Sequence, residues 1–295
     1  MTLLACQIFF TIAHEGSFAR AAEQLHLTPS AISHAVASME AECGFPLFTR
    51  TKAGVTMTAA AENLLPDIQR LLASSETLDQ SIARINGMDK GVLRLAVFNS
   101  ACVTWIPHLL PSYEAQYPGI EVQLYQGSYA DIAAWLKSGT AEIGLMSNSS
   151  ALELDFEPLY ADPLVCIAPA GFVTQRPGIV TAEELRGQTF VSQRPDTDAD
   201  IQSYLKKQDL RVKTRCYVND DESTIAMVAC GQGVAIMPEL ILKRHQYQAG
   251  EFGILRLEPS ANRTIGLACL DKNGLSPAAR QFWQRARDYA RSLQA

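Results

Sequence analysis

Two short helical patterns joined by a tight turn constrain the fold of this chain more than any other feature. Ser17 is a natural N-cap for a first helix, whose apolar residues lie on one face as far as Leu25. Thr28 caps a second helix immediately afterwards, since Pro29 suits the first helical position, where its missing N–H is not needed. Two helices joined by so short a turn predict a helix-turn-helix.

The second helix of this motif carries small polar side chains on the face opposite its apolar stripe. Such side chains near a helix N-terminus reach base edges and phosphates in a major groove, although a polar face taken alone is more often simply solvated. A turn with two basic residues follows and predicts a wing beside the helices. The candidate DNA-binding residues are therefore Ser17, Thr28, Pro29, Ser30, Ala31, Ser33, His34, Arg50 and Lys52.

The charge of the chain gives this interpretation no support. Its formal net charge is −6, which by itself argues against a nucleic-acid binder. The first 58 residues hold three basic and four acidic side chains, so they form no basic patch. DNA binding is therefore predicted from the geometry of the motif alone.

One pattern extends over residues 9–58. It consists of Phe9, Ala13, Gly16, Ser17, Phe18, Ala21, Ala22, Leu25, Ala31, Ser33, Glu40, Gly44, Leu47, Phe48, Arg50 and Thr58. This arrangement resembles the LysR-type transcriptional regulators. Two positions depart from the family pattern. Pro29 replaces a glutamine that commonly touches DNA, which leaves the bases that are read undefined, and Ala61 replaces a glycine.

The resemblance implies a regulator that binds double-stranded promoter DNA sequence-specifically and changes transcription in response to a small-molecule effector. It implies a homodimer or homotetramer, with RNA polymerase as a further partner. The start of the chain lacks a basic segment before its apolar run, and no window approaches a membrane span. We therefore expect a cytoplasmic protein with no membrane partner, whose winged helix-turn-helix domain covers residues 1–58.

A heptad pattern follows over residues 59–90. Apolar residues recur at alternating steps of four and three, with Ser75 at the one polar position, which favours a partner helix over packing within the domain. The family resemblance implies dimerisation through the same helix. The segment 86–91 predicts the end of this helix and a hinge after it. The predicted dimerisation residues are Leu64, Ile68, Leu71, Leu78, Ile82 and Ile85.

Residues 91–295 change to alternating strands and helices, which predicts parallel α/β units. The expected fold class is α/β, with an N-terminal all-α winged helix-turn-helix and a two-lobed effector domain like the type 2 periplasmic binding proteins. The resemblance implies that the last strand and helix return to the first unit. Lobe 1 is then expected over residues 91–162 and 268–295, and lobe 2 over residues 163–267.

An effector cleft is expected between these lobes, because open α/β sheets bind ligands at the carboxyl ends of their strands. Hydroxyls and helix N-termini at those ends favour a small polar metabolite, carboxylate-bearing or, because of two neighbouring aspartates, amino-bearing or hydroxylated. A simple N-cap is the alternative role for each hydroxyl. The candidate effector-binding residues are Ser100, Cys102, Ser128, Ser147, Thr197 and Asp220.

Three other classes of protein fit the sequence less well than a LysR-type regulator that senses a metabolite. An α/β enzyme is disfavoured because nucleophile-elbow, dinucleotide-binding, Walker and metal-spaced histidine patterns are absent, so no catalytic residue, cofactor or metal is expected. An exported solute-binding protein is disfavoured by the helix-turn-helix. A cysteine-based redox sensor of the same family is the stronger alternative, since Cys216 and Cys230 fall in the second lobe.

Overall fold

The computed structural model describes residues 1–51, 54–193, 199–244 and 250–293. The N-terminal domain holds three helices, α1 (Leu3–Glu15), α2 (Phe18–Gln24) and α3 (Pro29–Cys43), and a hairpin of β1 (Phe48–Thr51) and β2 (Gly54–Met57). Ser17 and Thr28 cap α2 and α3, because their hydroxyls accept hydrogen bonds from the backbone N–H groups of Arg20 and Ala31. The winged helix-turn-helix is therefore present, with both of its expected caps.

Glutamate 40 fixes the passage from α3 into the hairpin. One oxygen of Glu40 accepts hydrogen bonds from the backbone N–H groups of Leu47, at 2.7 Å, and Phe48, at 3.3 Å. Leu47 is fully buried among α1, α3 and the following helix. The wing is thus attached to the helical core at its base.

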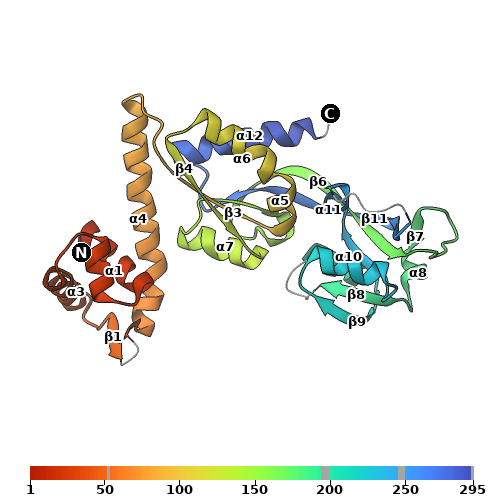
Figure 1. Cartoon of the computed structure of the whole chain (residues 1–295), viewed down its shortest axis with the longest axis horizontal. Coiled ribbons are helices and arrows are strands. Elements are labelled where there is room, and N and C mark those ends of the chain that lie inside the picture. The colour runs from red at the N-terminus through yellow and green to blue at the C-terminus, as the bar shows by residue number, and fades with distance from the viewer. Residues whose placement is uncertain (52–53, 194–198, 245–249, 294–295) are drawn as a thin grey trace.

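The helix α4 (Ala59–Ile85) connects this domain to the rest of the chain and stands between the two in Figure 1. Near its start, Ile68 is buried with Phe9 and Met39 in the core of the N-terminal domain. Further along, Gln80 lies over Gly91, so closely that a β-carbon on that glycine would collide with the Gln80 side chain. One helix is therefore packed against both domains.

Lobe 1 is built on a largely parallel sheet between helices. Strands β4, β3 and β5 pair in parallel, and β5 then pairs antiparallel with a long strand from the C-terminal part. The elements are β3 (Gly91–Val97), α5 (Asn99–Thr104), α6 (Ile106–Gln116), β4 (Ile120–Gln126), α7 (Tyr129–Ser138), β5 (Ile143–Ser147), a 3₁₀ turn (Asn148–Ser150) and α12 (Pro277–Ser292).

Two long strands, β6 (Asp155–Pro169) and β11 (Phe252–Cys269), run antiparallel through both lobes. Their residues Asp162 and Arg263 are register partners in the region where the strands cross between lobes. Ile265 to Ala268 pair with β5, so β11 already belongs to lobe 1 before residue 268. The sequence pattern predicts only the apolar parts of these strands, because their polar middle segments resemble loops.

Lobe 2 lies beyond this crossing (Figure 1) and contains a small parallel pair, β8 and β9, beside β10. Its elements are β7 (Ile179–Thr181), α8 (Ala182–Leu185), β8 (Thr189–Gln193), α9 (Ala199–Lys207), β9 (Lys213–Val218), α10 (Asp221–Ala229), β10 (Ala235–Pro238) and α11 (Glu239–Arg244). No helix in the described part of the chain is both long enough and apolar enough to cross a membrane.

Candidate functional site

The exposed end of α3 is the first candidate site. Ser30, Ala31 and His34 are exposed, Ser33 is half-buried, and Ile32 is fully buried on the other side of the helix. The Thr28 hydroxyl is engaged by the backbone N–H of Ala31, and Pro29 occupies the first helical position, exposed. Short polar side chains therefore lie on an open helix face, where a DNA backbone could approach closely.

The wing carries the two basic candidates for DNA binding, Arg50 and Lys52. Arg50 lies in β1 with its backbone opposite Val55, and Lys52 falls outside the described residues. The backbone N–H of Val55 donates to the carbonyl of Gly16, which holds the hairpin against the turn between α1 and α2. The wing and Ser17, which caps α2 beside that turn, thus lie next to one another.

The predicted dimerisation residues divide into two groups on α4. Leu71, Leu78, Ile82 and Ile85 are exposed, the last of them by 85%. Leu64 and Ile68 instead pack into the core of the N-terminal domain. The exposed apolar stripe of α4 therefore begins after Ile68.

The opposite face of α4 docks on lobe 1. Glu76 accepts a hydrogen bond from Arg94 of β3 at 2.5 Å, and Gln80 donates to the carbonyl of Val92 at 2.9 Å. Nearer the start of the helix, Arg70 donates to the carbonyl of Lys137 at 3.2 Å. The helix thus has a polar face bonded to lobe 1 and an apolar face without described contacts.

A cleft of about 270 Å³ lies between the lobes and is lined from both. Of the predicted effector-binding residues, Ser100, Ser128 and Asp220 line it. Ser147 is fully buried and Cys102 packs against the core of lobe 1, so neither lines the cleft, while Thr197 falls outside the described residues. The other residues that line the cleft are Phe98, Asn99, Gln126, Gly127, Tyr129, Gln193, Asn219, Asp221, Pro238, Ile241 and Arg263.

Arg263 forms the floor of this cleft. Its guanidinium donates to the Ser100 hydroxyl at 2.7 Å and to the Tyr129 hydroxyl at 3.3 Å, and it lies 5.0 Å from the centre of the Phe98 ring. The same guanidinium is ion-paired with Asp162. Burial raises the pKa of the Asp162 carboxyl, an effect that Arg263 and the Leu240 N–H oppose. A single cation therefore joins the strand crossing to the hydroxyls of lobe 1.

A hydrogen-bonded chain of side chains bridges the lobes across the cleft. Asn99 of lobe 1 donates to one oxygen of Asp221 at 3.0 Å, and Gln193 of lobe 2 donates to the other at 2.6 Å. Gln126 in turn donates to Asn99 at 3.0 Å. Because Asp221 and Asn99 belong to different lobes, these hydrogen bonds connect the two lobes across the cleft.

Two of the predicted hydroxyl and carboxylate groups also have the capping role considered above. Ser128 caps α7 in a reciprocal box with Asp131, and the hydrogen bonds from Ser128 lower the pKa of the Asp131 carboxyl. Asp220 caps α10 by accepting from the Ser223 N–H at 2.7 Å and from its hydroxyl at 2.8 Å. Both residues therefore cap a helix and line the cleft.

The sequence reasoning missed Arg263 altogether. The candidate residues come from the carboxyl ends of strands, whereas Arg263 lies within β11. An available signal is an acidic residue, Asp162, at the first expected crossing between lobes and a basic residue, Arg263, a few positions before the second. Buried charges are usually paired, so these two were candidates for each other.

Two family models match the chain and show the family to which it belongs. The model for the "LysR substrate binding domain" matches residues 86–291, and that for the "bacterial regulatory helix-turn-helix protein, lysR family" matches residues 3–62. The chain belongs to the LysR family. It is a LysR-type transcriptional regulator with an effector-binding domain, and the family consists of regulators rather than enzymes.

Known members of the LysR family align with nearly the whole chain. CfxR of Cupriavidus necator is 27% identical over 284 residues, covering 95% of this chain and 89% of that protein. A full-length OxyR variant of Pseudomonas aeruginosa matches with a TM-score of 0.77 at 21% identity, covering 99% of this chain and 95% of that one. CbnR complexed with its target DNA matches with a TM-score of 0.65 at 18% identity, covering 98% and 100%. These structures share the fold of this chain.

Proposed function

We propose that this LysR-type regulator binds promoter DNA as a dimer or tetramer through the α3 face and the wing, and responds to a small metabolite bound between its lobes. The cleft is the observation that carries the effector part of this proposal. It is lined from both lobes, and the Asn99–Asp221 hydrogen bond crosses it. A ligand that replaces this bond changes how the lobes are held together, which is the requirement for a signal.

The chemistry of the lining narrows the class of effector. Its one described cation, Arg263, is already neutralised by Asp162, whereas Asp220 and Asp221 stand at the lobe 2 side without a cationic partner among the described residues. Amide and hydroxyl groups from Asn99, Gln126, Ser128 and Gln193 supply most of the remaining polar contacts. This lining favours a hydroxylated or amino-bearing metabolite over a simple carboxylate.

Thermal denaturation in the presence of a metabolite library tests the effector site. A ligand bound only to the folded protein should raise the melting temperature, and the Ser100→Ala/Ser128→Ala variant should lose that response while still binding operator DNA. Ser149→Ala provides a control, because the Ser149 hydroxyl donates to the Ser147 hydroxyl and Ser149 does not line the cleft. A double variant that responds as the parent protein does would place the effector elsewhere.

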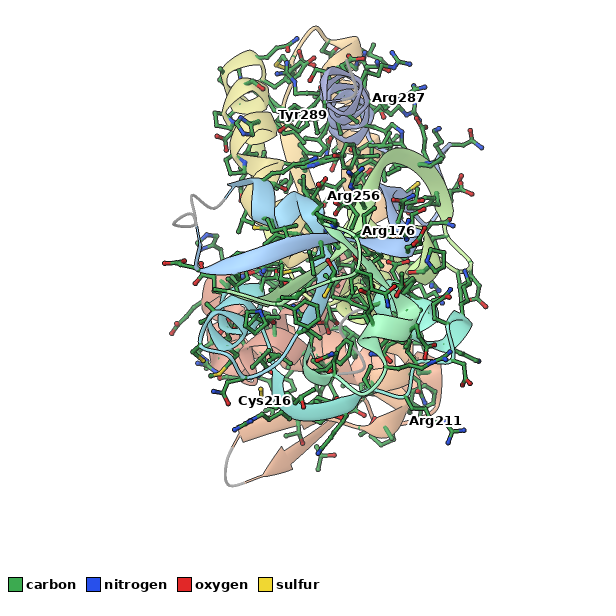
Figure 2. The ribbon with its side chains drawn as sticks, turned by 90° about the vertical axis from the view of Figure 1, so that its right-hand side faces the viewer. Arg176, Arg211, Cys216, Arg256, Arg287 and Tyr289 are labelled. Atoms are coloured by element: carbon green, nitrogen blue, oxygen red, sulfur yellow. The ribbon has the colours of Figure 1, made fainter. Side chains whose placement is uncertain are left out.

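Redox sensing through cysteine remains the second candidate function. Cys230 is exposed at the end of α10, and Cys216 is half-buried on β9, the element on which Figure 2 labels it. Both thiols are free, and Cys230 donates to the carbonyl of Met227 at 3.3 Å. A peroxide-treated sample that runs as a new, reduction-sensitive band on a non-reducing gel, and loses that band in Cys230→Ser, would favour this function over the metabolite effector.

A further inference from the structure

A second hollow of about 740 Å³ lies on lobe 1, between α6 and α12 and beside the end of α4. Figure 1 shows α6 and α12 next to one another at the side of lobe 1 away from β8 and β9. The residues that line this hollow and those that line the cleft do not overlap. It is therefore a separate cavity, and the function proposed above does not use it.

Three arginines meet in this hollow. Arg84 comes from the last turn of α4, whereas Arg280 and Arg285 come from α12. Arg285 donates to the Ser112 hydroxyl at 2.5 Å and to the side-chain carbonyl of Gln116, and Arg280 donates to the carbonyl of Asn273 at 2.8 Å. These partners are uncharged, so they orient the guanidinium groups and leave their charge uncompensated.

No carboxylate of the described residues neutralises this group. Asp288 is the one acidic residue in the lining, and its carboxylate lies 3.6 Å from Arg291 and accepts from Gln284 at 3.0 Å. Arg94 and Arg263, by contrast, each have a carboxylate partner within hydrogen-bonding distance. Three arginines against one aspartate leave the lining with an excess of positive charge, which attracts anions.

The rest of the hollow fits an anion with further polar groups. His108 and Tyr289 stack with ring centres 5.7 Å apart and form one wall. Gln281, Gln284 and the Ser112 hydroxyl add uncharged polar groups to the lining. Planar guanidinium groups bind the oxygens of phosphates and carboxylates through paired N–H donors, and three such groups in one hollow favour an anion with several charges and several oxygens, as a diphosphate has.

We infer that this hollow is a second ligand site, which binds a multiply charged phosphate compound through Arg84, Arg280 and Arg285. Because Arg84 belongs to the linker helix and the other two to lobe 1, the bound anion joins the end of α4 to the effector domain. The site thus gives the regulator an input that is independent of the cleft.

Titration calorimetry of the full-length protein with inorganic pyrophosphate, at constant ionic strength, tests the site. We expect saturable binding to the parent protein, weakened by about tenfold or more in Arg280→Ala/Arg285→Ala. The exposed Arg84→Ala should weaken binding as well, and it decides the matter if the double variant fails to fold. The cleft variant Ser100→Ala/Ser128→Ala should bind pyrophosphate as the parent protein does, whatever its response to metabolites.

The matched control is Arg211→Ala/Arg215→Ala. It removes the same charge from exposed positions of lobe 2, and Figure 2 shows Arg211 at the opposite end of the effector domain from Tyr289. Equal loss of binding in this control would show a general charge effect and overturn the inference. Absence of saturable binding to the parent protein would overturn it too.

Discussion

The carboxylate of Asp162 and the guanidinium of Arg263 lie 2.7 Å apart where β6 and β11 pass between the lobes, and their side chains are 0% and 3% exposed. Asp162 also accepts from the backbone N–H of Leu240 at 2.9 Å, at the start of α11. Arg263 reaches the Ser100 hydroxyl in the other direction. The pair thus connects the crossing strands with both sides of the cleft floor.

Removing one member of this pair should destabilise the protein strongly. Arg263→Ala leaves the Asp162 charge buried without its partner, which typically costs about 3 to 5 kcal/mol. The double variant Asp162→Asn/Arg263→Met carries neither charge and should recover much of that loss. Urea denaturation of the three proteins gives the comparison. A single variant as stable as the parent would mean that Asp162 is neutralised by another group.

The apolar stripe of α4 should hold the oligomer together. Leu71→Asp or Ile82→Asp places a charge in the stripe, so we expect dissociation toward monomer and weaker operator binding. Leu71→Met keeps the position apolar and serves as the control. Size-exclusion chromatography with light scattering measures the mass of each. Unchanged mass in both aspartate variants would show that the stripe is not the interface.

The α3 face should read bases, and the wing should contact the DNA backbone. Ser33→Ala or His34→Ala should cost about 1 to 3 kcal/mol of specific binding if the side chain contacts a base. Arg50→Ala should weaken specific and nonspecific DNA alike and reduce the dependence of binding on salt. Titrations of operator and scrambled DNA at several salt concentrations separate the two effects. Three variants that bind like the parent would show that the recognition surface is misassigned.

The stability of lobe 1 should depend on the ionisation of Glu142. Burial raises the pKa of this carboxyl from its ordinary value of 4.5, although hydrogen bonds from Ser276 and the charge of Arg94 oppose the rise. The folded protein then holds the proton more tightly than the unfolded chain, so the contribution to stability is complete below 4.5 and is lost as the pH rises through the folded pKa.

Comparison with Glu142→Gln isolates this contribution, because the other titrating groups are the same in both proteins. The melting temperature of the variant should increase relative to that of the parent protein as the pH rises from about 4.5 to about 7. A constant difference across this range would mean that folding leaves the pKa of Glu142 unchanged.

The sequence predicted the helix-turn-helix and the alternating α/β units because both rest on local signals. Capping by Ser17 and Thr28 and the period of the apolar residues are visible in a few neighbouring positions. Ser100, Ser128 and Asp220 were predicted from strand ends for the same reason, and they line the cleft. Local signals define where a strand ends, and the fold then brings several such ends together.

Features that depend on which face meets which neighbour could not be predicted in this way. Ile68 continues the heptad of α4 without interruption, yet it packs against Phe9, because the N-terminal domain lies beside the first turns of the helix. Ser147 ends a strand as Ser100 follows one, and both are buried, but only Ser100 lines the cleft. Arg263 reaches the cleft from within a strand, since two chain crossings meet there.

The double attachment of α4 limits where movement can occur within one subunit. Because the same helix is packed into the DNA-binding domain at Ile68 and bonded to lobe 1 at Glu76 and Gln80, these parts form a single mechanical unit. Under the proposed function, lobe 2 is then the part expected to move when an effector enters the cleft. In the proposed oligomer this movement would leave the DNA-binding helix of its own subunit in place, so the signal from the cleft would pass through whatever lobe 2 touches in the neighbouring subunit.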